Sequence, residues 1–248
     1  MPYRLLTRAA SRAGGRLGWS RAAVGAALGV AVAAVVNHIL SGIGGATLPW
    51  LLAPVGASAV LVLALPASPL AQPWPLFGGS MVSALVGLTA AQWIPYPELA
   101  CAVALGLAIV AMSVLRCLHP PGGACALLAA TAGPVTASHA MLALVLPLAA
   151  NLIALAAAGW FYNGLTGHPW PHRAPEPQPL PDGGWAGSYD ASDLDAVLEE
   201  WDEVLDVSRA DLDLLFRAVE RRVQTRSRLH TTAGKRTAAT QRESESEG

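Results

Sequence analysis

One short segment of this sequence, residues 117–128, carries residue types that could do chemistry. It places His119, two prolines and two glycines within a hydrophobic region that is nearly free of charge. A histidine in such a region can take up and release a proton near neutral pH, so His119 is a candidate proton carrier or gate. A helix that begins at Pro121 would also direct its positive dipole end, and uncovered N–H groups beside the following glycines, toward this point. The pattern therefore predicts a site for a small anion.

Residues 54–61 repeat the pattern of residues 121–128. The two octapeptides align without a gap, are identical at five of eight positions and place Ser58 opposite Cys125. Chance similarity is the alternative, because glycine and alanine are abundant in this chain. A true repeat would bring two half-helices together at their N-terminal ends around one substrate. The expected substrate-binding residues are Pro54, Gly56, Ala57, Ser58, His119, Pro120, Pro121, Gly122, Gly123, Ala124 and Cys125.

The composition assigns the middle of the chain to a membrane. Of its 248 residues, 53% are hydrophobic and 13% are charged, against roughly 25% charged in soluble domains. Between residues 22 and 171 the charged residues are Glu98 and Arg116 alone. A soluble fold of that size with two charges would precipitate, so this region is expected to lie in a lipid bilayer.

Six hydrophobic segments are expected to position the site: residues 22–40, 54–65, 76–94, 99–118, 121–133 and 140–162. The second and fifth are short, and the second would be about 18 Å long as a helix, too short for a hydrocarbon core of about 30 Å. Each short segment is the middle one of three. Two tandem units of three segments are inverted relative to one another, and short Pro- and Gly-interrupted segments at matching positions indicate a substrate site near the bilayer midplane. The predicted fold is an all-α polytopic helical bundle of two inverted repeats.

The two ends of the chain differ from its middle. Residues 1–21 contain five arginines, which predicts a cytoplasmic N-terminus. Residues 22–167 are the expected membrane domain, residues 168–191 a proline-rich linker, residues 192–229 cytoplasmic amphipathic helices and residues 230–248 a disordered tail. The two amphipathic helices, with Ser208 and Asp211 as a capping pair for the second, are expected to form a hairpin or a dimerising element.

No cofactor, metal or nucleic acid is expected. The three cysteines form no Cys-x-x-Cys pair, and they are interpreted as packing residues, with Cys125 of interest because of its neighbours. The expected partners are the lipid bilayer and a small anion. Small residues on one face of residues 76–94 would also allow a homo-oligomer.

Three motifs, taken together, are similar to the HPP family of integral membrane proteins. They are residues 119–124 (HPPGGA), residues 54–58 (PVGAS) with 68–73 (SPLAQP), and residues 162–167 (YNGLTG), and the resemblance extends over roughly residues 15–173. It implies a bacterial or plastid membrane protein, usually described with four spans. Plant and cyanobacterial relatives are implicated in nitrite transport.

Two features depart from that family pattern. Ser80 stands where members often carry a histidine, which leaves His119 without a second titratable partner. Many bacterial members continue into paired CBS nucleotide-sensing domains, and here a polar tail follows instead, so regulation by adenine nucleotides is not carried over.

The favoured function is a transporter or channel for a small inorganic anion, nitrite before others, and not an enzyme. The expected location is the bacterial inner membrane, with several passes and both termini cytoplasmic. One alternative is a signalling or scaffolding protein that acts through residues 192–229. The other is an intramembrane hydrolase with Ser58 or Cys125 as nucleophile and His119 as base.

Overall fold

The computed structural model describes residues 3–44, 51–132, 141–174, 189–200 and 206–226. These residues belong to two compact units, divided after Arg173. The first is the hydrophobic part of the chain and the second is the charged part. All regular structure within the described ranges is helical.

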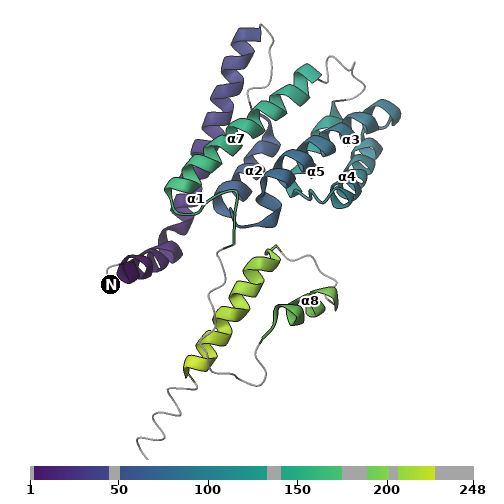
Figure 1. Ribbon diagram of the computed structural model, residues 1–248. Helices are drawn as coiled ribbons and strands as arrows, with labels where there is room; N and C mark the ends of the chain where they lie inside the picture. The colour runs from purple at the N-terminus through teal and green to yellow at the C-terminus, as the bar shows by residue number, and fades with distance from the viewer. Residues whose placement is uncertain (1–2, 45–50, 133–140, 175–188, 201–205, 227–248) are drawn as a thin grey trace, which may run out of the picture. The chain divides into compact units, whose positions relative to one another are not determined.

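The first unit, here called the membrane unit, consists of long and short helices (Figure 1). In chain order its elements are α1 (Tyr3–Gly44), α2 (Ala53–Ala64), the 3₁₀ turn η1 (Pro69–Ala71), the π-helical turn η2 (Pro75–Gly79), α3 (Ser80–Trp93), α4 (Pro97–Val114), α5 (Pro120–Thr131), the π-helical turn η3 (Met141–Val145) and α7 (Leu146–Leu165). Because η2 continues into α3 and η3 into α7, the described chain has four helices long and apolar enough to cross a membrane: Gly18–Gly42, Pro75–Trp93, Pro97–Val114 and Ala143–Leu165. The predicted all-α polytopic fold is confirmed.

The two short segments are also present. Helices α2 and α5 have 12 residues each, and both begin with proline in their first turn. A count of four spans and a count of six segments therefore describe the same chain: four long helices and two short ones.

The structure shifts several predicted boundaries. Helix α1 contains the predicted apolar segment 22–40 and extends back to Tyr3, because no proline interrupts residues 3–44 and arginine and alanine favour helix. Helix α4 ends at Val114 rather than at residue 118, because Arg116 takes a left-handed conformation (φ 52°) that a helix cannot continue through. Helix α7 runs three residues beyond residue 162, to Leu165.

The helices of the membrane unit pack in two groups. Helix α1 packs on α2 and α7, whereas α4 packs on α5 and α3, and α3 packs closely on α5 (Figure 1). We call the two sets of three consecutive helices triplets: α1, α2 and α3 form the first, and α4, α5 and α7 the second. The third helix of each triplet therefore packs against the first and second helices of the other triplet. Because each third helix packs on the other triplet, the two triplets form a single packed unit.

The contacts of two glycines support the internal repeat. A Cβ atom at Gly87 of α3 would lie 2.7 Å from Cβ of Ala129 in α5, and one at Gly159 of α7 would lie 2.5 Å from Cγ1 of Val62 in α2. Val62 and Ala129 occupy the same position when Pro54 is aligned with Pro121. The two third helices thus contact the two short helices at equivalent points, which chance similarity of eight residues does not explain.

The first helices of the two triplets match as well. Helix α1 buries one residue every four along Gly25, Gly29, Ala33 and Asn37, and helix α4 does the same along Ala100, Ala104, Ala108 and Met112. Small residues, which occupy most of these positions, allow helices to approach closely in a membrane. The repeat therefore extends over all three segments.

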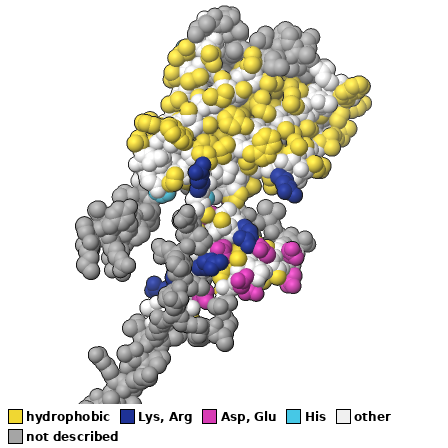
Figure 2. Space-filling model, in the orientation of Figure 1, with side chains coloured by type: hydrophobic (Ala, Val, Ile, Leu, Met, Phe, Trp, Pro, Cys, Tyr) yellow, Lys and Arg dark blue, Asp and Glu magenta, His cyan; other side chains and the backbone are white. Residues whose placement is uncertain are grey.

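Hydrophobic side chains cover the face of the membrane unit seen in Figure 2. Large apolar residues are exposed along its long helices, for example Leu28 at 51%, Val110 at 58% and Ile153 at 61%. Exposure of this extent would be costly in water and is expected for helices in contact with lipid.

The chain after α7 stays with the membrane unit for several residues. Trp170 is buried and its indole N–H donates to the Ala71 carbonyl (2.9 Å), while the His172 N–H donates to the Gln72 side chain (2.9 Å). The first residues of the expected linker therefore pack on the connector between α2 and α3. The remaining linker residues 175–188, and residues 227–248 with the expected tail, lie outside the described ranges.

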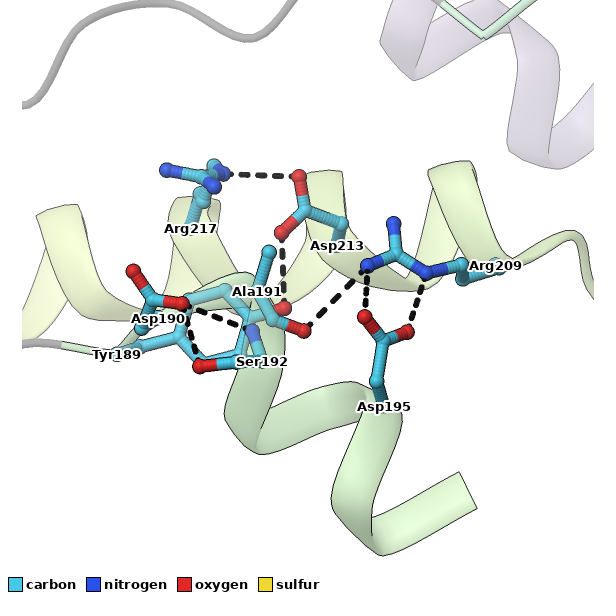
Figure 3. Close-up of polar contacts among 8 residues, drawn as sticks. All are labelled: Tyr189, Asp190, Ala191, Ser192, Asp195, Arg209, Asp213 and Arg217. Atoms are coloured by element: carbon cyan, nitrogen blue, oxygen red, sulfur yellow. Dashed lines mark hydrogen bonds and ion pairs between the residues drawn. The ribbon is translucent and has the colours of Figure 1, made fainter. Parts of the chain in front are cut away.

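The second unit contains α8 (Ala191–Glu200) and a helix over residues 209–226. Side chains before and within these helices join them: Arg209 pairs with Asp195, and Asp213 accepts from both Tyr189 (2.8 Å) and Arg217 (2.8 Å), as Figure 3 shows. The expected capping contact is present, because the Asp211 N–H donates to Ser208 Oγ (3.1 Å).

Substitution of Gly87 tests the close contact between α3 and α5. Gly87→Ala should destabilise the protein by about 1–3 kcal/mol, because the new methyl group would clash with the Ala126 carbonyl oxygen. Gly106→Ala in α4 is the matched control: its Cβ meets nothing within 4 Å, so it should be neutral or stabilising by about 0.5–1 kcal/mol. Thermal unfolding in detergent measures both, and equal stability of the two variants would contradict the packing.

The phenol of Tyr189 tests the contacts of the second unit. Burial raises the pKa of Tyr189 to about 12, and the hydrogen bond to Asp213 and the negative charge of Asp213 act in the same direction. Asp213→Asn should therefore lower the pKa of Tyr189 toward its usual value of about 10. The pKa of Tyr189 is higher in the folded protein than in the unfolded chain. Its contribution to folding stability is therefore complete below pH about 10 and is lost as the pH rises through about 12. Ultraviolet titration, with Tyr189→Phe to assign the signal, measures the shift, and an unchanged pKa in Asp213→Asn would contradict it.

Candidate functional site

His119 lies at the start of α5, where the chain returns from the end of α4. The left-handed turn at Arg116 reverses the chain, and His119 follows in an extended conformation (φ −138°, ψ 104°). Proline at the next position favours that conformation, because its ring clashes with a helical residue before it. The side chain of His119 is fully buried, with 0% exposure.

Both ring nitrogens of His119 have a partner. Nδ1 lies 2.8 Å from the Leu70 carbonyl oxygen, and Nε2 lies 2.9 Å from Ser58 Oγ. A carbonyl oxygen only accepts hydrogen bonds, so Nδ1 carries a proton and donates it to Leu70. In the neutral ring Nε2 then has a lone pair, and the Ser58 hydroxyl donates to it.

The Leu70 carbonyl is positioned by a compact turn. Ser68 Oγ accepts from the Leu70 N–H (3.1 Å), and the Gln72 side-chain amide donates to the carbonyls of Pro66 (3.0 Å) and Ser68 (2.8 Å). The proline-rich connector between α2 and α3 thus folds back on itself. Its main-chain oxygen reaches a histidine 49 residues later in the sequence.

Glycines bring α3 and α5 together beside His119. A Cβ atom at Gly79 would lie 2.6 Å from Cβ of His119, and one at Gly122 would lie 2.8 Å from the Gly79 carbonyl oxygen and 2.9 Å from Ser83 Oγ. No larger residue fits at either position without a shift of backbone. The glycines therefore permit the contact of backbone with backbone that places α3 hydroxyl groups next to the first turn of α5.

Two of those hydroxyl groups are buried without a strong partner. Ser80 and Ser83 are 0% exposed, and within the described part of the chain neither Oγ has a nitrogen or oxygen partner. The thiol of Cys125, which is a weak hydrogen-bonding group, is the neighbour of Ser80. We refer to Ser58, Ser80, Ser83 and His119 as the serine–histidine cluster.

The structure brings together part of the predicted site. Ser58, His119, Pro121, Gly122, Gly123 and Cys125 are buried in the unit, and Pro54 is buried in the first turn of α2. Ala57, Pro120 and Ala124 are exposed, and Gly56 is half-buried with open space where a Cβ would lie. Those four residues are not buried with the others because each short helix turns only one face toward the interior.

Some of the N–H groups that were expected to be uncovered at the start of α5 are absent or paired. Pro120 and Pro121 have no N–H, and the Gly122 N–H donates to the His119 carbonyl oxygen (2.7 Å). In α2 the Val55 N–H similarly donates to the Leu52 carbonyl oxygen (2.9 Å). Gly122 therefore provides close packing rather than a free donor, and the side chains of the cluster offer hydrogen-bond donors for a ligand.

Ser80 and Ser83 were not among the substrate-binding residues expected from the sequence, although Ser80 was noted as the position where family members often carry a histidine. Ser80 and Ser83 lie in a segment whose small residues suggested helix packing, and a backbone carbonyl such as that of Leu70 leaves no sequence signal. The spacing of the two serines was a signal that could have been used, because residues three positions apart lie on the same face of a helix. Two hydroxyls on one face of an apolar helix indicate a polar patch in the interior.

Arg21 holds the other end of α2. Its guanidinium donates to the Leu63 carbonyl oxygen (3.0 Å) and to Asn163 Oδ1 (3.1 Å), and Asn163 in turn donates to the Val62 carbonyl oxygen (2.8 Å). These carbonyls belong to the last turn of α2, where no later N–H of the helix donates to them. A positive group at a helix C-terminus also complements the helix dipole. Arg21 is therefore a positioning residue for α2 and for Ser58.

The fold and the site define a class of protein: a multi-pass helical membrane protein whose two short helices meet around a buried histidine. A family model described as "HPP, transmembrane region" matches residues 12–171. The chain belongs to this family, and the resemblance of the three sequence motifs is confirmed.

Two transmembrane proteins of Dictyostelium discoideum are similar to part of the chain. One is 48% identical over 83 residues and the other 44% identical over 82 residues. Each aligned stretch covers 32% of this chain, and 27% and 29% of the two relatives, so less than a third of either relative is matched. No solved structure matches the chain.

Proposed function

We propose that this protein carries a small inorganic anion across a membrane and that nitrite is the favoured substrate. The observation that carries the proposal is the serine–histidine cluster, a group of buried polar side chains from α2, α3 and the start of α5 in an apolar unit. Among the described residues Ser83 has no hydrogen-bond partner and Ser80 has only the weak thiol of Cys125. A buried hydroxyl without a partner costs about 1–3 kcal/mol, so the two serines favour a ligand that accepts hydrogen bonds. Membership of the HPP family supports the same proposal.

The chemistry of the cluster suits a small anion held weakly. Ser80 and Ser83 offer hydroxyl donors, and protonation of the His119 ring adds a positive charge to the cluster. The two charged residues of the central region, Glu98 and Arg116, are both exposed. Transport requires that the substrate bind strongly enough to enter and weakly enough to leave, and neutral donors meet that requirement better than a fixed cation.

The location and assembly belong to the same proposal. We infer a bacterial inner membrane with both termini in the cytoplasm, because residues 4–21 carry five arginines and arginine-rich ends remain inside. A homo-oligomer is compatible with the exposed apolar residues Leu215, Phe216 and Val219 of the second unit.

Hydrolysis is a second candidate because one observation favours it. Ser58 Oγ lies 2.9 Å from Nε2 of His119, and the Leu70 carbonyl orients the ring, which is the arrangement of a nucleophile, a base and an orienting group. Against it, Ser58 is 1% exposed and the two prolines remove the backbone donors that an oxyanion would need. We therefore propose transport and not catalysis.

A fluorophosphonate probe should leave Ser58 unlabelled, and labelling that disappears in Ser58→Ala would favour the hydrolase.

Uptake of nitrite into proteoliposomes tests the transport proposal. Wild-type protein should accelerate uptake above that of protein-free liposomes, and His119→Ala should abolish the acceleration because the ring links Ser58 to Leu70. His168→Ala is the matched control, since His168 is an exposed histidine of the same unit and should leave uptake unchanged. Full uptake by a folded His119→Ala protein, or no uptake by the wild type, would contradict the proposal.

A further inference from the structure

His119 can be satisfied in both of its protonation states without any movement of the backbone. In the neutral ring Nδ1 donates to Leu70, and the Ser58 hydroxyl donates to Nε2. In the charged ring Nε2 carries a proton and donates to Ser58 Oγ instead. The Ser58 hydroxyl then has a second acceptor, the Pro54 carbonyl oxygen at 3.4 Å, within the same helix.

The change between the two states is a rotation of one hydroxyl group. A hydroxyl has one proton and can donate it to one acceptor at a time, so Ser58 donates either to Nε2 or to Pro54. Buried polar groups that lose their partners are costly. Because none is lost here, the pair can take up a proton and release it while the surrounding helices stay packed.

No charged side chain in the described part of the chain neutralises the protonated ring. The groups that contact His119 are the Ser58 hydroxyl of α2, the Leu70 carbonyl of η1 and the backbone of Gly79 at the end of η2. Within residues 117–128 the other titratable side chains are the thiols of Cys117 and Cys125.

The charged residues of the membrane unit lie elsewhere. Arg116 and Glu98 of the α4 region are exposed, and Arg21 is bound to the last turn of α2. Among the described side chains, no carboxylate forms an ion pair with His119. The charge of a protonated ring would therefore have no counter-ion among the side chains that the structure describes.

A lone positive charge in this interior is expensive, and an anion beside it offsets the cost. Protonation of Nε2 therefore favours anion binding, and by reciprocity a bound anion favours protonation. The hydroxyls of Ser80 and Ser83 are available donors where α3 meets the first turn of α5, and they complete the anion's hydrogen bonds.

We propose that the Ser58–His119 pair binds one proton together with each anion, so that the protein transports the two as a neutral pair. This inference rests on the proposed anion transport and assigns its coupling ion. The proton enters the Nε2 lone pair from water on one side of the membrane and leaves to water on the other, and the Ser58 hydroxyl returns to Nε2 after each release. Charge balances at every turnover, since one negative and one positive charge move together.

The test is flux into proteoliposomes under separate control of the pH gradient and the membrane potential. Nitrate is used beside nitrite, because nitrous acid crosses bilayers unaided whereas nitric acid is too strong an acid to do so, and protein-free liposomes are subtracted. With the potential clamped at zero by valinomycin and potassium, an inward gradient of one pH unit should drive accumulation of about tenfold at equilibrium. A potential without a pH gradient should have no effect.

Variants of His119 and Ser58 separate the coupling between proton and anion from the transport of the anion itself. His119→Gln, which keeps a polar group of similar size but has no proton to exchange, should lose the response to the pH gradient, and Ser58→Ala should weaken it. His168→Gln should behave as the wild type. Wild-type uptake that follows the potential and ignores the pH gradient would overturn the proton coupling while leaving anion transport intact. Absence of any protein-dependent uptake of either anion would instead remove the proposed function itself.

Discussion

A hydrogen-bonded chain from Leu70 through His119 to Ser58 is the interaction on which the interior of the membrane unit depends. It joins the connector after α2, the start of α5 and the second turn of α2, which are far apart in sequence. In a bilayer no water satisfies a stray polar group, so a buried histidine is tolerated only where both ring nitrogens find partners. The compact turn at η1 and the glycine contacts of Gly79 and Gly122 can be understood as the means by which those partners are brought within reach.

The repeat is symmetric in packing and asymmetric in chemistry. The short helices bury the same faces, and the third helices touch them at equivalent glycines. However, Leu52 precedes α2 where His119 precedes α5, and Ser58 stands opposite Cys125. In the group of helices α1, α2 and α7, Asn37 and Asn151 are buried, and both donate to the Pro147 carbonyl oxygen. Within the described residues, two halves of one architecture thus hold one buried histidine between them, which is what a single proton site requires.

Hydrophobic periodicity and proline positions were sufficient to predict the helices, including the two short ones, because membrane insertion and the missing N–H of proline act locally. The octapeptide repeat also pointed to Ser58 and His119, which the structure places in contact. Fewer N–H groups are uncovered at the start of α5 than expected, because Pro120 and Pro121 have none and that of Gly122 is paired. The Leu70 carbonyl and the burial of Ser80 and Ser83 depend on how the connector and α3 fold against α5, and no local pattern contains that information.

The protonation state of His119 in the presence and absence of anion tests the central claim most directly. Solid-state ¹⁵N NMR of histidine-labelled protein in lipid bilayers resolves the two ring nitrogens, and His119→Gln assigns the signal. At a pH where the anion-free ring is neutral, the account predicts a proton on Nδ1 and a hydrogen-bonded lone pair on Nε2, and it predicts that nitrite converts the ring to the form with protons on both. A neutral ring with its proton on Nε2, or a protonation state that nitrite does not change, would contradict it.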